Sequence, residues 1–198
     1  MKKQSIRMTL FGLAIAAFLL AGCAGMQTAS EATFKTPEVT LSHAEVPSYF
    51  GMWFYDNKVQ PTRGKPGNYG APLIYAFIFN IKNPNEFPVL MDNLKYTVAL
   101  DGFDLNTPSS QEATWIPGEK TTQLRTYCVL GMFEASGALV FAEGGFKIKK
   151  MNMPPMDLIE KWWTAAPDFS FPVELKDGSA VFKADGITKV AAFKAKYP

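Results

Sequence analysis

The sequence LIYAFIFNIKNPNEFPVLMDNLKYTVAL, residues 73–100, contains two runs of alternating side chains separated by a turn. In the first run the odd-numbered positions 73–81 are apolar or aromatic, and part of the opposite face is apolar too. This pattern is typical of a central strand that is buried on both sides at one end. The run ends at Asn83-Pro84-Asn85, because proline cannot donate to a sheet and asparagine favours a turn. The second run, over 93–100, has the strict alternation of a half-buried antiparallel strand.

Working outward, similar short runs predict further strands at 38–46, 111–116, 121–130, 169–176 and in the last twenty residues. Turn residues separate them at Pro117-Gly118, Asp177-Gly178 and Asp185-Gly186. Many short strands with turns between them predict a mainly β domain over residues 37–198, an antiparallel sandwich or a barrel.

One short helix is expected in the C-terminal half. Asn152 can cap it, Pro154 and Pro155 stand where a first helical turn tolerates proline, and Ala165-Ala166-Pro167 ends it. Apolar side chains recur at helical spacing between these limits, so we expect a lid over one end of the β domain. The preceding stretch, 131–150, is ambiguous: its part ALVFAEGGFKIKK fits a hairpin, and the glycine-rich part before that fits a loop or a short helix.

The run from Ile74 to Leu105 resembles the late embryogenesis abundant type 2 family, also described as the water stress and hypersensitive response domain. The resemblance rests on the Asn83-Pro84 turn, the step Phe87-Pro88-Val89, the strand start Asn93-Leu94-Lys95-Tyr96 and the turn Asp101-Gly102. It implies an antiparallel β-sandwich similar to fibronectin type III and immunoglobulin domains, with no catalytic group in the motif. The insertion 51–70 and the long C-terminal half depart from the family pattern.

The first residues have the features of a bacterial lipoprotein signal peptide. Three basic residues precede an uncharged apolar stretch, residues 9–20, and the sequence Leu20-Ala21-Gly22-Cys23 resembles a lipobox. We therefore expect residues 1–22 to be removed and Cys23 to be acylated, with 23–36 forming the lipid anchor and a flexible tether. An uncleaved transmembrane anchor is the alternative, since residues 8–26 carry no charge.

Several acyl chains on Cys23 would hold the protein stably on a membrane. Ala24 stands where an inner-membrane retention signal would place aspartate, so the resemblance to lipoproteins implies the outer membrane, with the domain facing the periplasm. Removing residues 1–22 takes away three basic residues and no acidic one, which leaves 17 Lys+Arg against 18 Asp+Glu. That balance excludes the basic stripe expected of a nucleic-acid-binding protein, and nucleic acid is not an expected partner.

Few residues of the sequence are candidates for catalysis or metal binding. Cys128 is the one thiol left once Cys23 is acylated, and its parity places it on the core face, where an inert thiol is expected. The single histidine, His43, lies on the first predicted strand as a packed or edge residue. We expect no catalytic residues, no metal and no cofactor, although the thioethers of Met151, Met153 and Met156 would suit Cu(I) if they did not pack the helix start.

The aromatic clusters leave two interpretations open. Trp53-Phe54-Tyr55 and Trp162-Trp163 are either core residues or, if exposed together beside the helix, an apolar binding surface. The sequence therefore predicts a lipid-anchored, non-enzymatic envelope protein with a binding or protective role. The resemblance to the late embryogenesis abundant type 2 family implies desiccation or water-stress tolerance as that role. The alternative is an accessory or lipid-binding subunit of an envelope transport or assembly system, with an apolar ligand or an envelope protein as its partner.

Overall fold

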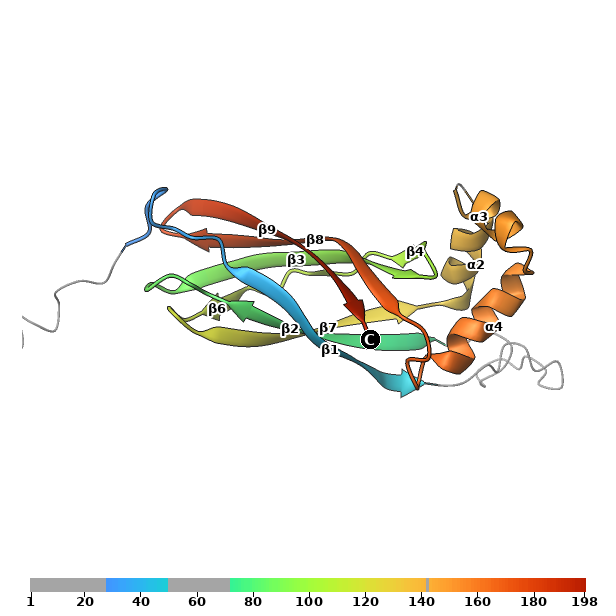
Figure 1. The fold of residues 1–198 in the computed structure, drawn as a ribbon. Coiled ribbons are helices and arrows are strands. Elements are labelled where there is room, and N and C mark those ends of the chain that lie inside the picture. Colours follow the sequence, from blue (N-terminus) through green and yellow to red (C-terminus); the bar gives the residue numbers. More distant parts are fainter. Residues whose placement is uncertain (1–27, 50–71, 142) are drawn as a thin grey trace, which may run out of the picture.

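The computed structural model describes residues 28–49, 72–141 and 143–198 and has the form of a two-layered β-sandwich with helices at one end (Figure 1). All strand pairs in this part of the chain are antiparallel. The predicted mainly β, antiparallel sandwich is therefore confirmed.

The first layer, sheet A, has the strand order β1-β2-β7. Its members are β1 (Glu38–Tyr49), β2 (Leu73–Lys82) and β7 (Thr121–Leu130).

The second layer, sheet B, has the order β4-β3-β8-β9, and two short strands pair with β3 as well. Its members are β3 (Val89–Leu100), β4 (Phe103–Asn106), β5 (Ser109–Ser110), β6 (Thr114–Ile116), β8 (Val173–Ala184) and β9 (Ile187–Tyr197). The chain crosses between the layers after β2, β6 and β7, as in Greek-key sandwiches of the immunoglobulin type.

The core lies between the layers and follows the alternation of the two central strands. The odd-numbered side chains of β2 from Leu73 to Ile81 are fully buried. On β3 the side chains at 94, 96, 98 and 100 are buried as well. Tyr96 also provides a polar link between the layers, because its hydroxyl lies 2.6 Å from the hydroxyl of Thr126 on β7.

One predicted turn was wrong. Asp177-Gly178 lies inside β8, where the pairing register shifts between Leu175 and Gly178 and Asp177 has a φ of 50°. The two residues form a β-bulge, which uses the same Asp-Gly backbone preference as a turn without reversing the strand. The other two turns are where they were predicted, and Asp185-Gly186 has the two positive φ angles of a tight hairpin turn.

Three helices occupy the connection from β7 to β8, where one was expected. They are α2 (Met132–Val140), α3 (Glu143–Met151) and α4 (Pro155–Ala165), so the ambiguous stretch 131–150 forms two helices. Helix α4 is the predicted one, but Asn152 does not cap it. With a φ of 50° and its N–H donated to the Lys149 carbonyl, Asn152 instead ends α3. The helices together cover one end of the sandwich, as expected of a lid (Figure 1).

The last residues of the predicted tether lie against the sandwich. Phe34 is buried and its ring packs edge-on against Phe87 at 5.9 Å. The Ala29 N–H donates to the Asp185 carboxylate, and the Lys35 N–H donates to the Asn85 side chain. The folded part of the chain therefore begins before residue 37.

Candidate functional site

Of the two aromatic clusters considered as a binding surface, the structure describes only one. Trp53, Phe54 and Tyr55 lie outside the described residues, as do Leu20, Ala21, Gly22 and Cys23. Trp162 and Trp163 on α4 are fully buried and belong to the core. These two tryptophans therefore form no exposed patch.

Trp162 has a structural role that explains its burial. Its indole N–H donates to the Asp101 carboxylate at 2.9 Å, and its ring packs edge-on against Phe103 at 5.8 Å. Lys161 donates to the same carboxylate at 2.7 Å. Because Asp101 lies in the β3–β4 turn, these contacts attach α4 to the end of sheet B.

The structure does not bring the one described cysteine and the one histidine together as a nucleophile and base. Cys128 is buried, and burial raises the pKa of its thiol to about 12, so at neutral pH it is a protonated core side chain. His43 lies partly exposed on β1, with Ser42 and Glu45 as its hydrogen-bond partners. This arrangement activates neither residue.

Metal-ligating side chains do not gather in the described part of the chain, where no group of three or more His, Cys, Asp or Glu side chains could hold an ion. Met151 is exposed, while Met153 and Met156 pack against the core as partly buried residues. Packing of two methionines at the start of α4 agrees with their expected role as space-filling side chains.

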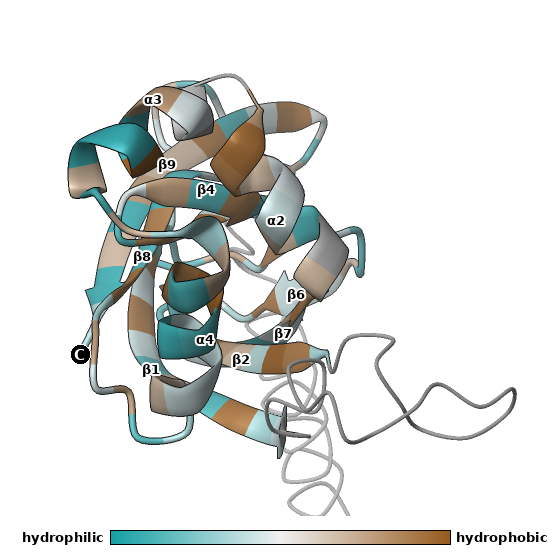
Figure 2. Ribbon diagram, turned by 90° about the vertical axis from the view of Figure 1, so that its right-hand side faces the viewer, coloured by the Kyte–Doolittle hydropathy of each residue, from teal (hydrophilic) through white to brown (hydrophobic). Residues whose placement is uncertain are grey.

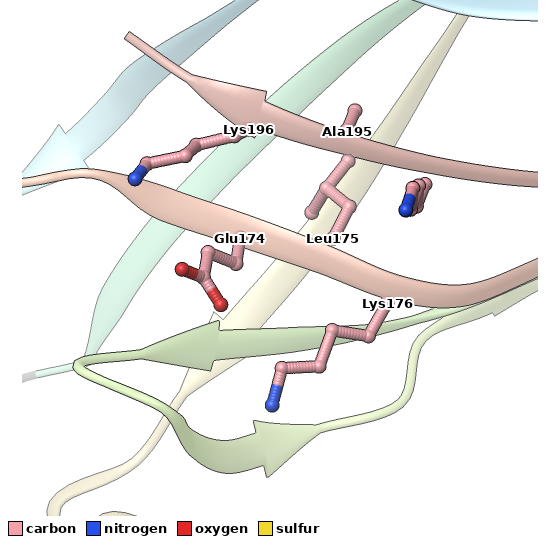
Figure 3. Close-up of a pocket in the computed structure, with 6 residues that line it drawn as sticks. Glu174, Leu175, Lys176, Ala195 and Lys196 are labelled. Atoms are coloured by element: carbon pink, nitrogen blue, oxygen red, sulfur yellow. The ribbon is translucent and has the colours of Figure 1, made fainter.

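Two shallow hollows are present on the described surface. One lies along the paired strands β8 and β9 of sheet B, beside the β8 bulge, and Figure 3 shows lysine side chains and one glutamate around it. Lys176 in this hollow forms an ion pair with Asp104 at 2.7 Å. The other lies between α3 and α4. Their lining residues are Glu174, Leu175, Lys176, Lys194, Ala195 and Lys196 for the first, and Ile148, Lys149, Asn152, Met153, Pro154 and Pro155 for the second.

The most distinctive surface is apolar and lies where α2 meets α3. Val140, Phe141 and Phe146 are 57%, 73% and 74% exposed. Large aromatic side chains seldom remain this exposed without a partner, and an exposed apolar group with a polar border is typical of an interaction site. We call Val140, Phe141, Phe146, Lys149 and Lys150 the α2–α3 corner.

Both lysines of the α2–α3 corner are exposed and follow Phe146 by three and four residues. Residues at this spacing lie on the same face of a helix, so Phe146 and the two ammonium groups point the same way. Lys147 has a different role, since its ammonium group donates to the Gly102 carbonyl and lies 5.8 Å from the centre of the Phe103 ring. Figure 2 views the molecule from this end and shows apolar and polar segments side by side on α3.

Sequence reasoning missed the α2–α3 corner. The stretch ALVFAEGGFKIKK was interpreted as a hairpin, in which its phenylalanines would alternate with polar residues and could pack inward. A signal was present, because Phe146, Lys149 and Lys150 have helical spacing, but Gly144-Gly145 weakens any helical prediction there.

A second, smaller apolar area lies on the outer face of sheet A. Tyr127 and Val129 on β7 are 56% and 52% exposed. Beside them the Arg125 guanidinium lies 2.6 Å from the Glu45 carboxylate on β1, and this contact crosses the middle strand β2. The hydrogen bond from Arg125 holds the pKa of Glu45 below its usual range.

The α2–α3 corner and the N-terminal segment lie at opposite ends of the sandwich (Figure 1). The described chain begins at residue 28 beside the β8–β9 turn, where Ala29 contacts Asp185. The helices lie at the other end, beyond the β3–β4 turn. In the described residues, no helix is long and apolar enough to cross a membrane.

Comparisons with known proteins give only distant likenesses. No family model and no curated protein matches the chain. Among solved structures, a protein from Archaeoglobus fulgidus is similar at 8% identity with a TM-score of 0.40, covering 82% of this chain and 92% of its own. The ApaA protein from Bordetella pertussis has 10% identity and a TM-score of 0.40, covering 82% and 93%.

A solution structure of a late embryogenesis abundant protein is also similar, at 14% identity with a TM-score of 0.35, covering 100% of this chain and 86% of its own. None of these three TM-scores reaches 0.5. The function of this chain therefore has to be argued from its own residues.

Proposed function

We propose that this chain is a lipid-anchored protein of the bacterial cell envelope that acts by binding, with the helical end of its sandwich as the binding surface. In this proposal the signal peptide is removed, Cys23 is acylated, and the domain faces the periplasm from the outer membrane. The sandwich belongs to the late embryogenesis abundant type 2 kind and serves as a rigid support. It contributes no catalytic step.

The observation that carries the proposal is the exposure of Phe141 and Phe146 at the end of the molecule opposite the N-terminal segment. A protein that is attached at one end and exposes aromatic side chains at the other is suited to hold a partner away from its attachment point. The buried, protonated Cys128 and the partly exposed His43 offer no competing chemistry.

The anchor is tested on the full chain, produced in a bacterial host and extracted from its membranes with detergent. Intact mass spectrometry should show a chain that begins at Cys23 and carries acyl groups, and a Cys23→Ala variant should not be acylated. A chain that retains residues 1–22 would contradict the anchor and support the uncleaved alternative.

Binding is tested by native mass spectrometry of residues 28–198 and by organic extraction of what co-purifies. A lipid or other apolar molecule at fixed stoichiometry would support a lipid-binding role. For water stress, the measurement is the leakage of dye-filled vesicles, or the surviving activity of a client enzyme, after drying with and without the protein. If the protein protects neither vesicles nor enzyme, the stress role should be dropped.

A second candidate is an accessory subunit of an envelope transport or assembly system. Tyr127 and Val129 favour it, because they are exposed on β7, which among the described strands pairs only with β2. An edge strand with exposed apolar side chains can add a strand from a partner protein. Cross-linking from position 127 in intact cells, followed by isolation of one partner at fixed stoichiometry, would support this role over general protection.

A further inference from the structure

We propose that the α2–α3 corner is a second membrane contact, which binds the surface of a bilayer containing anionic lipid. This inference rests on the proposed function for the anchor at Cys23 and deepens it by naming the partner of the helical end. The two phenylalanines and Val140 enter the boundary between headgroups and acyl chains, and Lys149 and Lys150 bind lipid phosphates.

The apolar side chains of the corner form one surface. Gly145 packs so closely on the end of α2 that a Cβ at this position would lie 2.9 Å from the Val140 carbonyl oxygen. The close approach sets the start of α3, with Phe146 as the residue after Gly145, against the C-terminal end of α2, which ends at Val140. Phe141 follows directly, and its ring edge lies within 3.8 Å of the Cβ position of Gly137 on the last turns of α2.

The corner is also held firmly enough to present these side chains. On α2, Met132, Ala135 and Leu139 are buried, and on α3, Ile148 is buried. Because the inward faces of both helices are already packed in the core, the core loses no contacts when Phe141 and Phe146 stay exposed. A helix that buries one face and exposes phenylalanine and lysine together on the other has the composition of an interfacial helix.

The size and charge of the corner favour a lipid surface over a protein. A stable protein interface buries about 800 Å² on each partner, whereas three apolar side chains of this size offer roughly half of that. Exposed lysine is also depleted in protein interface cores. Next to a bilayer, by contrast, lysine stems extend along the apolar boundary and place their charge among phosphates.

Position in the molecule adds a geometric argument. If Cys23 is acylated, Thr28 follows it by five positions, so the N-terminal end of the sandwich lies within about 18 Å of the membrane. Strand β3 has 12 residues, which correspond to about 40 Å between the two ends. Contacts at both ends therefore lay the long axis of the sandwich along the membrane, and the anchor raises the effective concentration of the corner at the surface.

The test measures hydrogen–deuterium exchange in the full, acylated chain reconstituted into vesicles. One set of vesicles contains phosphatidylethanolamine and phosphatidylglycerol in equal amounts, and the other contains phosphatidylcholine alone. We expect the amides of residues 140–151 to exchange about tenfold more slowly or better in the anionic vesicles. The amides of β2 and β3 should exchange at the same rate in both.

The double variant Phe141→Ser with Phe146→Ser should abolish this protection, since it lowers the surface-binding equilibrium by on the order of a hundredfold. The pair Lys149→Gln with Lys150→Gln should weaken it by about tenfold or more, and high salt should do the same to the original chain. All four side chains are exposed, so folding is not at risk. Trp115→Ser is the matched control, because it removes a 63% exposed aromatic from β6 of sheet B, outside the corner, and should leave the protection of residues 140–151 unchanged.

Equal exchange of residues 140–151 in the two kinds of vesicle would overturn the proposal, as would protection that survives the double phenylalanine variant. Protection seen in native membranes but absent from pure lipid would overturn it in favour of a protein partner. The anchor is scored separately by the mass of the processed chain. A correctly acylated chain with an unprotected corner refutes the second contact alone, whereas a chain without acyl groups refutes the anchor.

Discussion

The side chain of Asn83 holds together the end of the sandwich opposite the helices. Its amide nitrogen lies 2.8 Å from the Phe87 carbonyl, 3.1 Å from that of Ile116 and 3.2 Å from that of Pro117. Its amide oxygen accepts the Asn85 backbone N–H at 3.0 Å. Asn83 is fully buried, so its side chain supplies the hydrogen bonds that water would otherwise give to the polar backbone groups of this turn.

Replacing this residue tests the network. Asn83→Ala should lower the free energy of unfolding by about 2–4 kcal/mol, because buried carbonyl and N–H groups lose their partners. The measurement is urea unfolding of residues 28–198. Asn80→Ala, which removes an exposed contact to Gln123 on the neighbouring strand, should cost less than about 1 kcal/mol. Equal effects of the two variants would show that the buried network is not needed.

The same network explains why residues 34 and 35 are part of the fold. The Asn85 amide nitrogen donates to the Lys35 carbonyl at 2.8 Å, and its oxygen accepts the Lys35 N–H at 2.7 Å. Sequence reasoning recognised Asn83-Pro84-Asn85 as a turn from the backbone preferences of asparagine and proline. It could not find the bonds to Ile116 and Lys35, because these partners lie 33 and 50 positions away along the chain.

At the scale of an element, the bulge in β8 depends on the absence of a side chain at Gly178. A Cβ there would lie 2.5 Å from the Phe193 ring and 2.6 Å from the Phe193 carbonyl oxygen on β9. The ring could move, but the backbone oxygen belongs to the sheet. Gly178→Ala should therefore destabilise the protein by about 2–4 kcal/mol and loosen the β8–β9 pairing.

The control is Gly137→Ala, in the interior of α2, where a Cβ meets the Phe141 ring at an ordinary 3.8 Å. Alanine is a better helix former than glycine, so this variant should be neutral or stabilise by about 0.5–1 kcal/mol. Thermal unfolding of both variants against the original chain makes the comparison. A harmless Gly178→Ala would mean that the bulge can be relieved.

Helix α4 is attached to sheet B by the indole N–H of Trp162. Trp162→Phe keeps most of the ring packing against Phe103 but leaves the Asp101 carboxylate without this donor. We expect a loss of about 1–2 kcal/mol by urea unfolding. Lys161→Ala removes a half-exposed ion pair to the same carboxylate and should cost less than about 1 kcal/mol. If Lys161→Ala costs more than Trp162→Phe, the ion pair is the main attachment.

The difference between predicted and observed elements has a physical pattern. Strands 73–82 and 121–130 were predicted to the residue, because alternation over 121–130 and a continuous apolar run bounded by a turn at 83–85 both limit the strands sharply. The helices α2 and α3 were not predicted, because the glycines at 144 and 145 lower the helical propensity of this stretch. In the structure, packing of the two helices against the sandwich outweighs that low propensity. The Asp177-Gly178 bulge could not be told from a turn, since both use the same backbone angles.

The candidate site was the least predictable part. Sequence reasoning left Trp162 and Trp163 open as either core residues or a binding surface, because neighbouring positions on a helix face different directions. Both are buried, since α4 packs against α2 and Trp162 also contacts Asp101 and Phe103 at the β3–β4 turn. Phe141 and Phe146 are exposed because they lie at a corner, and corners are set by how two helices meet rather than by the period of either one.

At the scale of the whole molecule, the two ends of the sandwich have opposite properties. One end is closed by a buried asparagine network and the docked residues 28–36. The other is closed by helices whose outer corner is apolar and basic. The β-sandwich between the two ends is rigid. A molecule bound at one end is therefore kept at a fixed distance from the other end. This suits a spacer or a two-point membrane contact better than an enclosed ligand carrier.

The stability of the whole domain should fall at alkaline pH. Burial raises the pKa of Cys128 to about 12, and burial also raises the pKa values of Tyr75 and Tyr96, the latter despite its bond to Thr126. In the unfolded chain a thiol loses its proton near pH 8.5 and a tyrosine near pH 10. Above these values the unfolded state binds fewer protons than the folded state, so the free energy of unfolding decreases with pH.

The contribution of these groups is therefore complete below about pH 8 and is lost as the pH rises toward 12. Cys128 alone should give a slope of about 1.4 kcal/mol per pH unit from roughly pH 9, and the tyrosines should steepen it above about pH 10. Urea unfolding of residues 28–198 between pH 7 and pH 10.5 measures the slope. Cys128→Ala should flatten the part between pH 9 and pH 10, although it lowers stability at neutral pH by leaving a small cavity. An unchanged slope in that variant would assign the alkaline loss to groups other than the buried thiol.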